Sequence, residues 1–105
     1  MASRKAYLEF ILEQLSSLEG VSSRAMMGEY LLYLNGKIVG GIYDDRLLIK
    51  PTSSARRLMP DAPEELPYEG AKPMLLVENV EDRAFLAGLF TAMEPELSAL
   101  KRKRS

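Results

Sequence analysis

Two tight-turn signals inside one apolar stretch constrain the fold of this chain more than any other feature of its sequence. Asn35-Gly36 is the dipeptide most typical of a two-residue β-hairpin, because both central positions of a type I′ turn have positive φ, which Asn and Gly tolerate. Asp44-Asp45 marks a second turn. The apolar runs around these turns predict an antiparallel meander of about four strands, over residues 21–28, 29–34, 37–43 and 46–50.

An amphipathic helix is predicted before the meander, over residues 4–18. Its apolar residues recur at three- and four-residue spacing, which places them on one face: Tyr7, Phe10, Ile11, Leu15 and Leu18. Ser3 is the predicted N-cap. Gly20 is the predicted C′ residue, because glycine adopts the left-handed conformation there without strain.

Beyond residue 51 the sequence predicts a short helix, an irregular loop, a strand and a last helix. Ser53 or Ser54 caps the short helix, which Pro60 ends. Four prolines and a glycine indicate an irregular loop over 60–73, and the apolar residues 74–78 indicate a strand. Asn79 is the predicted cap of the last helix. One face of that helix holds Phe85, Leu86, Leu89, Phe90, Met93 and Leu97, and Pro95 either kinks the helix or begins a new turn.

This order predicts a two-layer α+β fold, α-β4-α-β-α, in which N- and C-terminal helices flank an antiparallel meander of four to five strands. We expect one domain over residues 1–100 and a basic disordered tail over 101–105. Gly40-Gly41, inside the third strand, predicts a bulge or a close backbone approach, such as a helix crossing the sheet. If the face of the sheet opposite the helices is apolar, it needs a partner, which a homodimer would supply.

The residue types that are absent exclude several kinds of chemistry. The chain has no Cys and no His. Disulfides, thiolate nucleophiles, imidazole catalysis and the common zinc sites are therefore excluded, and we expect no catalytic residues, no metal and no cofactor. No run approaches the roughly 20 apolar residues that cross a bilayer. Glu9 and Glu13 interrupt the place of a signal-peptide core, so the expected location is the cytoplasm, without membrane contact.

Charge is distributed unevenly along the chain. The net charge is −1 overall, but the last residues carry four positive charges and the rest of the chain is acidic. The candidates for weak, salt-sensitive contact with nucleic acid are basic: Arg56, Arg57, Lys101, Arg102, Lys103 and Arg104. A solubilising tail is the simpler interpretation of residues 101–104. Gly36-Lys37 lacks the other residues of a phosphate-binding loop, and Asp44-Asp45 is better explained as a turn than as a metal site.

Several motifs together resemble one family, the N-terminal domain of the TfoX/Sxy competence regulators. Arg24-Ala25-Met26-Met27-Gly28-Glu29-Tyr30 resembles its Arg-Lys-Met-Phe/Met-Gly-Gly/Glu-Tyr signature, with Ala25 in place of the lysine. The segments 33–37 and 44–50 resemble its Tyr-x-Asp/Asn-Gly-Lys and Asp-Asp/Gly-Arg-x-x-x-Lys patterns. Residues 67–73 resemble the Pro-Tyr-x-Gly-Ala-Lys segment of a shorter, stand-alone branch.

The resemblance implies an α+β domain and a link to the regulation of natural DNA uptake. The full-length regulators of this family act as transcriptional co-activators and carry a second, C-terminal domain. Because fold analogy does not fix function, the role in DNA uptake stays an expectation.

Three hypotheses of function remain open at this point. The first is a non-enzymatic regulatory or protein-interaction module, with a possible homodimer and an unknown protein partner. Its candidate partner-binding residues are polar or adaptable: Arg24, Met27, Glu29, Asp45, Arg46 and Lys72. The second is an accessory DNA-binding protein that uses the basic tail. The third is a small-molecule-binding domain or an enzyme, in which Glu29, Asp45 and Lys72 would surround a cleft.

Overall fold

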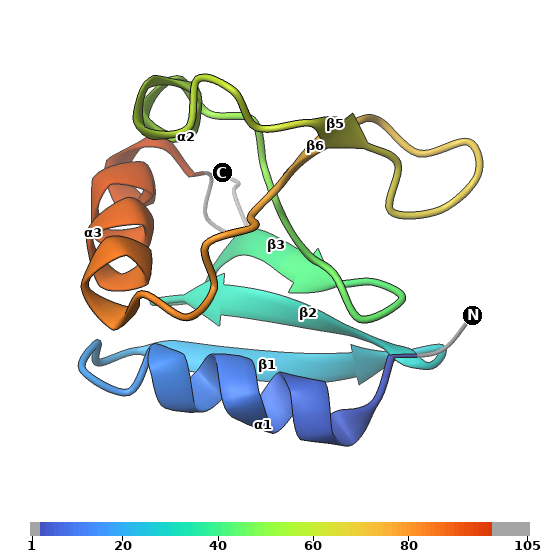
Figure 1. The fold of residues 1–105 in the computed structure, drawn as a ribbon. Coiled ribbons are helices and arrows are strands. Elements are labelled where there is room, and N and C mark those ends of the chain that lie inside the picture. Colours follow the sequence, from blue (N-terminus) through green and yellow to red (C-terminus); the bar gives the residue numbers. More distant parts are fainter. Residues whose placement is uncertain (1–2, 98–105) are drawn as a thin grey trace, which may run out of the picture.

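The computed structural model describes residues 3–97, and its elements follow the predicted order (Figure 1). The helices are α1 (Lys5–Gln14), α2 (Ser53–Leu58), α3 (Arg83–Met93) and the 3₁₀ turn η1 (Glu94–Glu96). The strands are β1 (Val21–Met26), β2 (Glu29–Leu34), β3 (Lys37–Ile42), β4 (Leu47–Ile49), β5 (Glu64–Glu65) and β6 (Met74–Leu76). The predicted α+β class and flanking helices are confirmed. The loop over 60–73 contains one short strand, β5, that the sequence did not predict.

Within the described residues the strands form one antiparallel sheet in the order β1-β2-β3-β4-β6-β5. Three two-residue turns join its first four strands, and both residues of each turn have positive φ: Met27-Gly28, Asn35-Gly36 and Asp44-Asp45. This is the signature of type I′ turns. The turns at 35–36 and 44–45 are confirmed. The turn at 27–28 corrects the predicted strand over 21–28, because β1 ends at Met26.

The glycine pair in β3 marks a bulge, as predicted. Leu32 opposes Gly40 while Tyr33 opposes Ile38, so Val39 is the extra residue on β3. A Cβ atom on Gly40 would lie 2.1 Å from the Leu48 carbonyl oxygen. The close approach at Gly40 is therefore to the neighbouring strand β4, and not to a helix that crosses the sheet.

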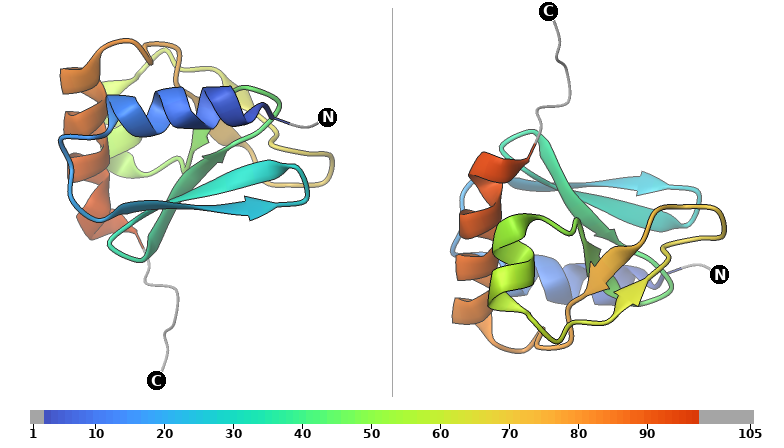
Figure 2. Two further views of the ribbon diagram at one scale, coloured as in Figure 1. Left: turned by 90° about the horizontal axis from the view of Figure 1, so that it is seen from below. Right: turned by 90° about the horizontal axis from the view of Figure 1, so that it is seen from above.

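A single core joins the helices to one face of the sheet. The side chains that lie fully inside it come from α1, α3 and the strands β2, β3 and β4: Ile11, Leu32, Ile42, Leu47, Ile49, Leu86, Leu89, Phe90 and Met93. Figure 2 shows α1 alongside β1 and β2, with α2 and α3 next to one another. Burial of this apolar surface is the main stabilising term of the fold.

The helix ends differ from the predicted caps. Ser3 does not cap α1, which starts after Arg4 without a side-chain cap. Thr52, rather than Ser53 or Ser54, accepts the Ala55 N–H at the start of α2. Asp82, rather than Asn79, accepts the Phe85 N–H at the start of α3. For α2 and α3 the sequence offers several capping residues within a few positions, and the structure uses one of them.

α1 is shorter than predicted and α3 ends at its proline. Residues 15–20 form turns instead of continuing the helix, and Gly20 has positive φ just before β1. A side chain there would clash with Asn35, since a Cβ atom would lie 2.0 Å from the Asn35 Oδ1. Pro95 lies in the first turn of the 3₁₀ helix η1, which starts at Glu94, so the proline belongs to a new turn and does not kink α3.

The face of the sheet opposite the helices is also apolar, but the chain covers much of it itself. Tyr33, Tyr43 and Leu48 point to this face and are buried. The loop between β5 and β6 lies along it, where the rings of Tyr43 and Tyr68 are 6.3 Å apart. These three side chains are therefore covered within the chain, and the possible homodimer stays a prediction.

We predict that Gly40→Ala lowers the free energy of unfolding by about 1–3 kcal/mol, because the new methyl group would press on the β4 backbone. Gly88→Ala is the matched control. It lies on an exposed face of α3 with no atom within 4 Å, so it should be neutral or stabilise by up to about 1 kcal/mol. Chemical denaturation measures both variants, and equal effects would contradict the close approach at Gly40.

Candidate functional site

The candidate residues Glu29 and Asp45 lie close to the N-terminal residues Ser3 and Arg4, and both accept hydrogen bonds from backbone N–H groups. The Ser3 hydroxyl bonds the Glu29 carboxylate and accepts the Asp45 N–H at 3.1 Å. Glu29 Oε1 also accepts the Asp44 N–H at 3.1 Å, and the Ser3 N–H donates to the Gly28 carbonyl at 2.9 Å. These bonds join the first residues described to the turns at 27–28 and 44–45. We name this network the N-terminal clamp.

Asp45 completes the N-terminal clamp through Arg4. Its two carboxylate oxygens accept the Arg4 backbone N–H and the Arg4 Nε, each at 2.8 Å. The backbone hydrogen bond from Arg4 holds the pKa of Asp45 below its ordinary value. Burial, and then the charge of Asp45, raise the pKa of the nearby Tyr7 phenol. The Asp45 carboxylate therefore stays ionised and bound at neutral pH, which suits a structural contact better than proton transfer.

Arg46 fastens the short strand β5 to the meander. Its Nε donates to the Tyr43 carbonyl at 3.0 Å, while its guanidinium forms an ion pair with Glu65 and donates to the Leu66 carbonyl at 3.4 Å. All three contacts lie within the fold. Arg46 thus positions the segment that leads into the loop before β6.

Arg24 and Met27 occupy an exposed region at β1, the terminal strand of the sheet. All residues of β1 after Val21 are exposed on both faces. Met27, in the turn that follows, is 96% exposed and has a φ of 52°. A large apolar side chain is thus held in solvent by a backbone conformation that favours glycine or asparagine.

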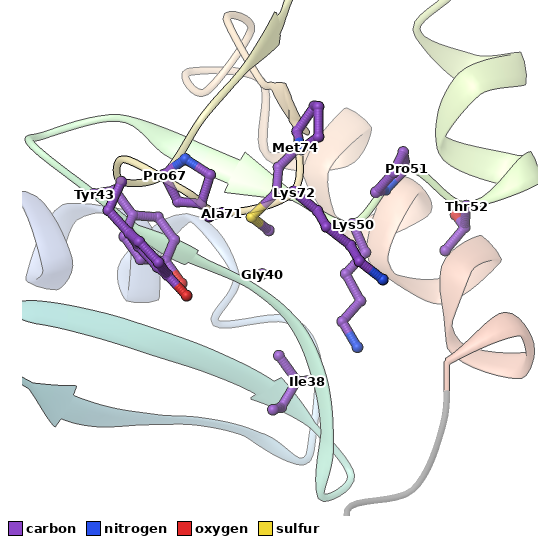
Figure 3. A pocket seen from close by; sticks show the side chains of 12 residues that line it. Ile38, Gly40, Tyr43, Lys50, Pro51, Thr52, Pro67, Ala71, Lys72 and Met74 are labelled. Atoms are coloured by element: carbon purple, nitrogen blue, oxygen red, sulfur yellow. The ribbon is translucent and has the colours of Figure 1, made fainter.

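Lys72 lies elsewhere, in a pocket of about 540 Å³ on the face of the sheet opposite the helices (Figure 3). Its walls come from β3 and the turn after it, the segment that follows β4, and the loop that leads into β6: Ile38, Gly40, Tyr43, Lys50, Pro51, Thr52, Pro67, Tyr68, Ala71, Lys72, Pro73 and Met74. Figure 3 shows Lys50 and Lys72 extending along the same side of the pocket. We name this site the two-lysine pocket.

The two-lysine pocket contains Lys72 but neither Glu29 nor Asp45, so the predicted cleft of these three residues is replaced by a different set. Lys50 and Tyr43 were not among the candidates. Lys50 had a signal in the sequence, because it ends the segment 44–50 that resembles the family pattern. Tyr43 had none beyond its place at the end of an apolar run.

The nucleic-acid candidates that the structure describes lie on α2. Arg56 forms an ion pair with Glu64 at 3.1 Å, and Arg57 donates to the Ser54 hydroxyl at 3.5 Å. Ser54 in turn donates to the Glu96 carboxylate from its backbone and its hydroxyl, and these bonds lower the pKa of Glu96. Lys101, Arg102, Lys103 and Arg104 lie outside the described residues, as does the predicted tail. DNA binding by these residues stays a prediction.

Two absences concern residues 3–97 alone. That part of the chain has no group of three or more acidic or other ligating side chains placed to hold a metal ion. It also has no helix that is both long and apolar enough to cross a membrane.

We predict that Asp45→Asn reduces the acid sensitivity of the fold. The pKa of Asp45 is lowered in the folded state, so its contribution is present above its ordinary value of 3.8 and is lost as the pH falls through the lower, folded value. Asparagine keeps the positive φ of the turn but has no charge to lose. Unfolding at a series of pH values between about 6 and 2 should therefore show a smaller loss of stability in the variant than in the wild type.

Asp61→Asn is the control for this experiment, because Asp61 is an exposed carboxylate outside the N-terminal clamp. It should follow the pH profile of the wild type. If Asp45→Asn and Asp61→Asn gave the same profile, the clamp would not depend on the charge of Asp45.

Comparisons with known proteins identify the family of this chain. The family model described as "TfoX N-terminal domain" matches residues 13–87. A protein of Spirochaeta aurantia, described as an uncharacterized 12.7 kDa protein in the trpE 5′ region, is 34% identical over 84 residues, which are 80% of this chain and 73% of that protein. No solved structure matches. The motifs at 24–30, 33–37 and 44–50 lie within the matched region, and the chain belongs to the TfoX N-terminal domain family.

Proposed function

We propose that this chain is a non-enzymatic regulatory module that works by protein contact, and that its contact surface is the outer edge of β1 with the turn Met27-Gly28. We name this surface the β1 edge. The observation that supports this proposal most directly is the exposure of Met27, whose side chain is 96% exposed at a backbone position with positive φ. Strained residues of this kind persist where the side chain serves a function.

Comparison of two turns in the same sheet supports this interpretation. The turn at 35–36 uses Asn35, which adopts positive φ readily. The turn at 27–28 has the same backbone form but uses Met27, at a cost of about 1 kcal/mol or more. Solvent exposure gives no packing energy that offsets this cost. A flexible, polarisable side chain such as Met is well suited to pack against a partner.

The backbone of β1 offers hydrogen-bonding groups to a partner. Met26 and Glu29 flank a two-residue turn and so form a hydrogen-bonded pair. Along β1 from this pair, residues whose backbone N–H and C=O point towards β2 alternate with residues whose backbone groups point away from it. The Asn35 N–H donates to the Gly20 carbonyl at 2.9 Å, which fits this alternation. The residues whose backbone groups point away from β2 are Val21, Ser23 and Ala25. In the described part of the chain no strand pairs with them.

A second copy of this chain is the partner that β1 fits best. Two antiparallel copies of β1 can pair with their outward residues opposed when Ser23 faces the second copy's Ser23. Arg24 then lies opposite the second copy's Ser22, so no like charges face one another. A shift of two residues in one direction would place Arg24 opposite the second copy's Arg24, and a shift in the other direction would shorten the paired segment of β1. The favoured register also places Met27 beside the second copy's segment before β1.

The non-enzymatic part of the proposal is supported by residue types and their contacts. The chain lacks His and Cys, and the candidate residues Glu29, Asp45 and Arg46 bind the fold itself. Membership of the TfoX N-terminal domain family supports a regulatory role connected with DNA uptake. In this proposal the chain controls that process through its contacts and changes no substrate.

A cysteine placed at the centre of the proposed interface tests it directly. The native chain has no Cys, so Ser23→Cys gives one thiol per molecule. Residues opposed in a hydrogen-bonded antiparallel pair have Cα atoms about 5.5 Å apart, which permits a disulfide. Mild oxidation should therefore yield a cross-linked dimer. Thr91→Cys, on an exposed part of α3, is the control and should remain monomeric on a denaturing gel.

The matched substitutions Ser23→Pro and Ser23→Thr separate pairing from folding. Proline removes an outward N–H and leaves the bonds to β2 intact, so it should give a folded monomer in light scattering. Threonine keeps the N–H and should keep the dimer. A wild-type protein that is monomeric at about 100 μM would contradict the second copy as partner. In a competent host, a Ser23→Pro allele should reproduce the DNA-uptake phenotype of a deletion.

We predict that Met27→Asn has opposite effects on stability and on contact. It should raise the free energy of unfolding of the monomer by about 1 kcal/mol, because Asn adopts positive φ at lower cost. It should also weaken the dimer, since the apolar contact is lost. Leu58→Asn is the control, because it removes an apolar side chain of 40% exposure from α2. A dimer equally weakened by both variants would contradict a specific role for Met27.

A further inference from the structure

We propose that the two-lysine pocket binds a small aromatic phosphate, with its phosphate held by Lys50 and Lys72 and its ring placed against Tyr43 and Tyr68. The pocket lies on the face of the sheet opposite the helices and shares no residue with the β1 edge. The proposal therefore does not depend on the contact function argued above.

The charged residues of the pocket wall favour an anionic ligand. Its wall contains two lysines and no Asp or Glu, although the chain outside residues 101–105 is acidic. Five other cations in the described part of the chain each form an ion pair: Arg4, Lys37, Arg46, Arg56 and Arg83. Lys50 and Lys72 are among the five cations of residues 3–97 that form none, together with Lys5, Arg24 and Arg57, but they are the two that line one pocket. Two ammonium groups that share a pocket without a carboxylate favour the binding of an anion.

The uncharged residues of the pocket wall favour a ligand with an aromatic ring. Ile38, Pro67 and Met74 supply apolar surface, and the rings of Tyr43 and Tyr68 meet at a centroid distance of 6.3 Å and an angle of 56°. Burial raises the pKa of the Tyr43 phenol, so its hydroxyl stays protonated as a donor. Aromatic walls of this kind accept a planar ring through offset or edge contacts.

Size and charge together define the ligand class. A volume of about 540 Å³ lies within the range of small-molecule sites, and it exceeds the volume of an inorganic ion. A phosphate monoester carries close to two negative charges at neutral pH, which match two lysines acting as point charges. The inferred ligand therefore joins a doubly charged phosphate to one aromatic ring system.

Phenyl phosphate is the probe that tests this inference, with inorganic phosphate and phenol as its two halves. In an amide NMR titration at constant ionic strength, phenyl phosphate should shift residues of β3, the end of β4 and the loop 67–73. It should bind more tightly than either half. Absence of a saturable shift up to about 10 mM, or shifts spread over the surface, would overturn the proposal.

Charge-removing variants identify the residues that hold the phosphate. Lys50→Gln and Lys72→Gln should each weaken binding of phenyl phosphate about tenfold, because each removes a charged hydrogen bond. Lys5→Gln makes the same change in net charge on α1, outside the pocket, and should leave binding unchanged. Equal losses in all three variants would indicate attraction by net charge alone and would overturn the site.

The aromatic contact has its own test. Tyr68 is 60% exposed, so Tyr68→Ala should leave the fold intact. It should weaken binding of phenyl phosphate while leaving the weaker binding of inorganic phosphate unchanged. Equal weakening of both probes would contradict a ring site at Tyr68. Tighter binding of an acidic peptide than of phenyl phosphate would assign the pocket to a protein partner and overturn the small-molecule proposal.

Discussion

The fold depends on three consecutive type I′ turns, which fix the register of the first four strands. Each turn requires positive φ at two positions, and only two of the six residues involved are glycines. Since a one-residue slip would turn every side chain of a strand to the other face, these turns decide which residues enter the core. The rest of the structure packs against the sheet that they define. The surrounding contacts must therefore offset the strain of these turns.

The contacts around the turn Asp44-Asp45 show how the strain is offset. Both aspartates have positive φ. Glu29 binds the N–H of Asp44, Ser3 binds the N–H of Asp45, and Arg4 binds its carboxylate. Residues far apart in the chain thus stabilise one short turn. The turn at Met27 also receives a bond, from the Ser3 N–H to the Gly28 carbonyl, but its side chain remains in solvent.

The sequence predicted the parts of the fold that local chemistry determines. Asn35-Gly36 and Asp44-Asp45 are turn dipeptides by their own backbone preferences, and the strands around them followed. The turn at 27–28 was missed because Met carries no turn preference, and β5 was missed because two residues pair there only through the tertiary fold. Family membership was also predicted. The roles of Glu29 and Asp45 could not be, because they depend on where Ser3 and Arg4 lie in space.

Of the two lysines in the two-lysine pocket, only Lys72 was predicted from the sequence as a site residue. Lys72 stood out in a loop with an unusual composition, but its neighbour Lys50 is 22 positions earlier in the sequence. They meet because β4 pairs with β6, which brings the loop before β6 back over the end of β4. A pairing between strands so far apart in sequence has no local signal. A site assembled by it becomes visible only once the sheet order is known.

The sheet order also decides whether the β1 edge and the two-lysine pocket can act together. β1 is the first strand in the order, while the pocket uses β3, the end of β4 and the loop before β6. Pairing at β1 therefore leaves the pocket open, and a ligand and a second copy can bind at once. Within the sheet, the path between them runs through β2 and the bulge of β3 at Val39, where the register shifts. If such coupling exists, it is reciprocal, so a ligand that favours the dimer must also bind the dimer more tightly.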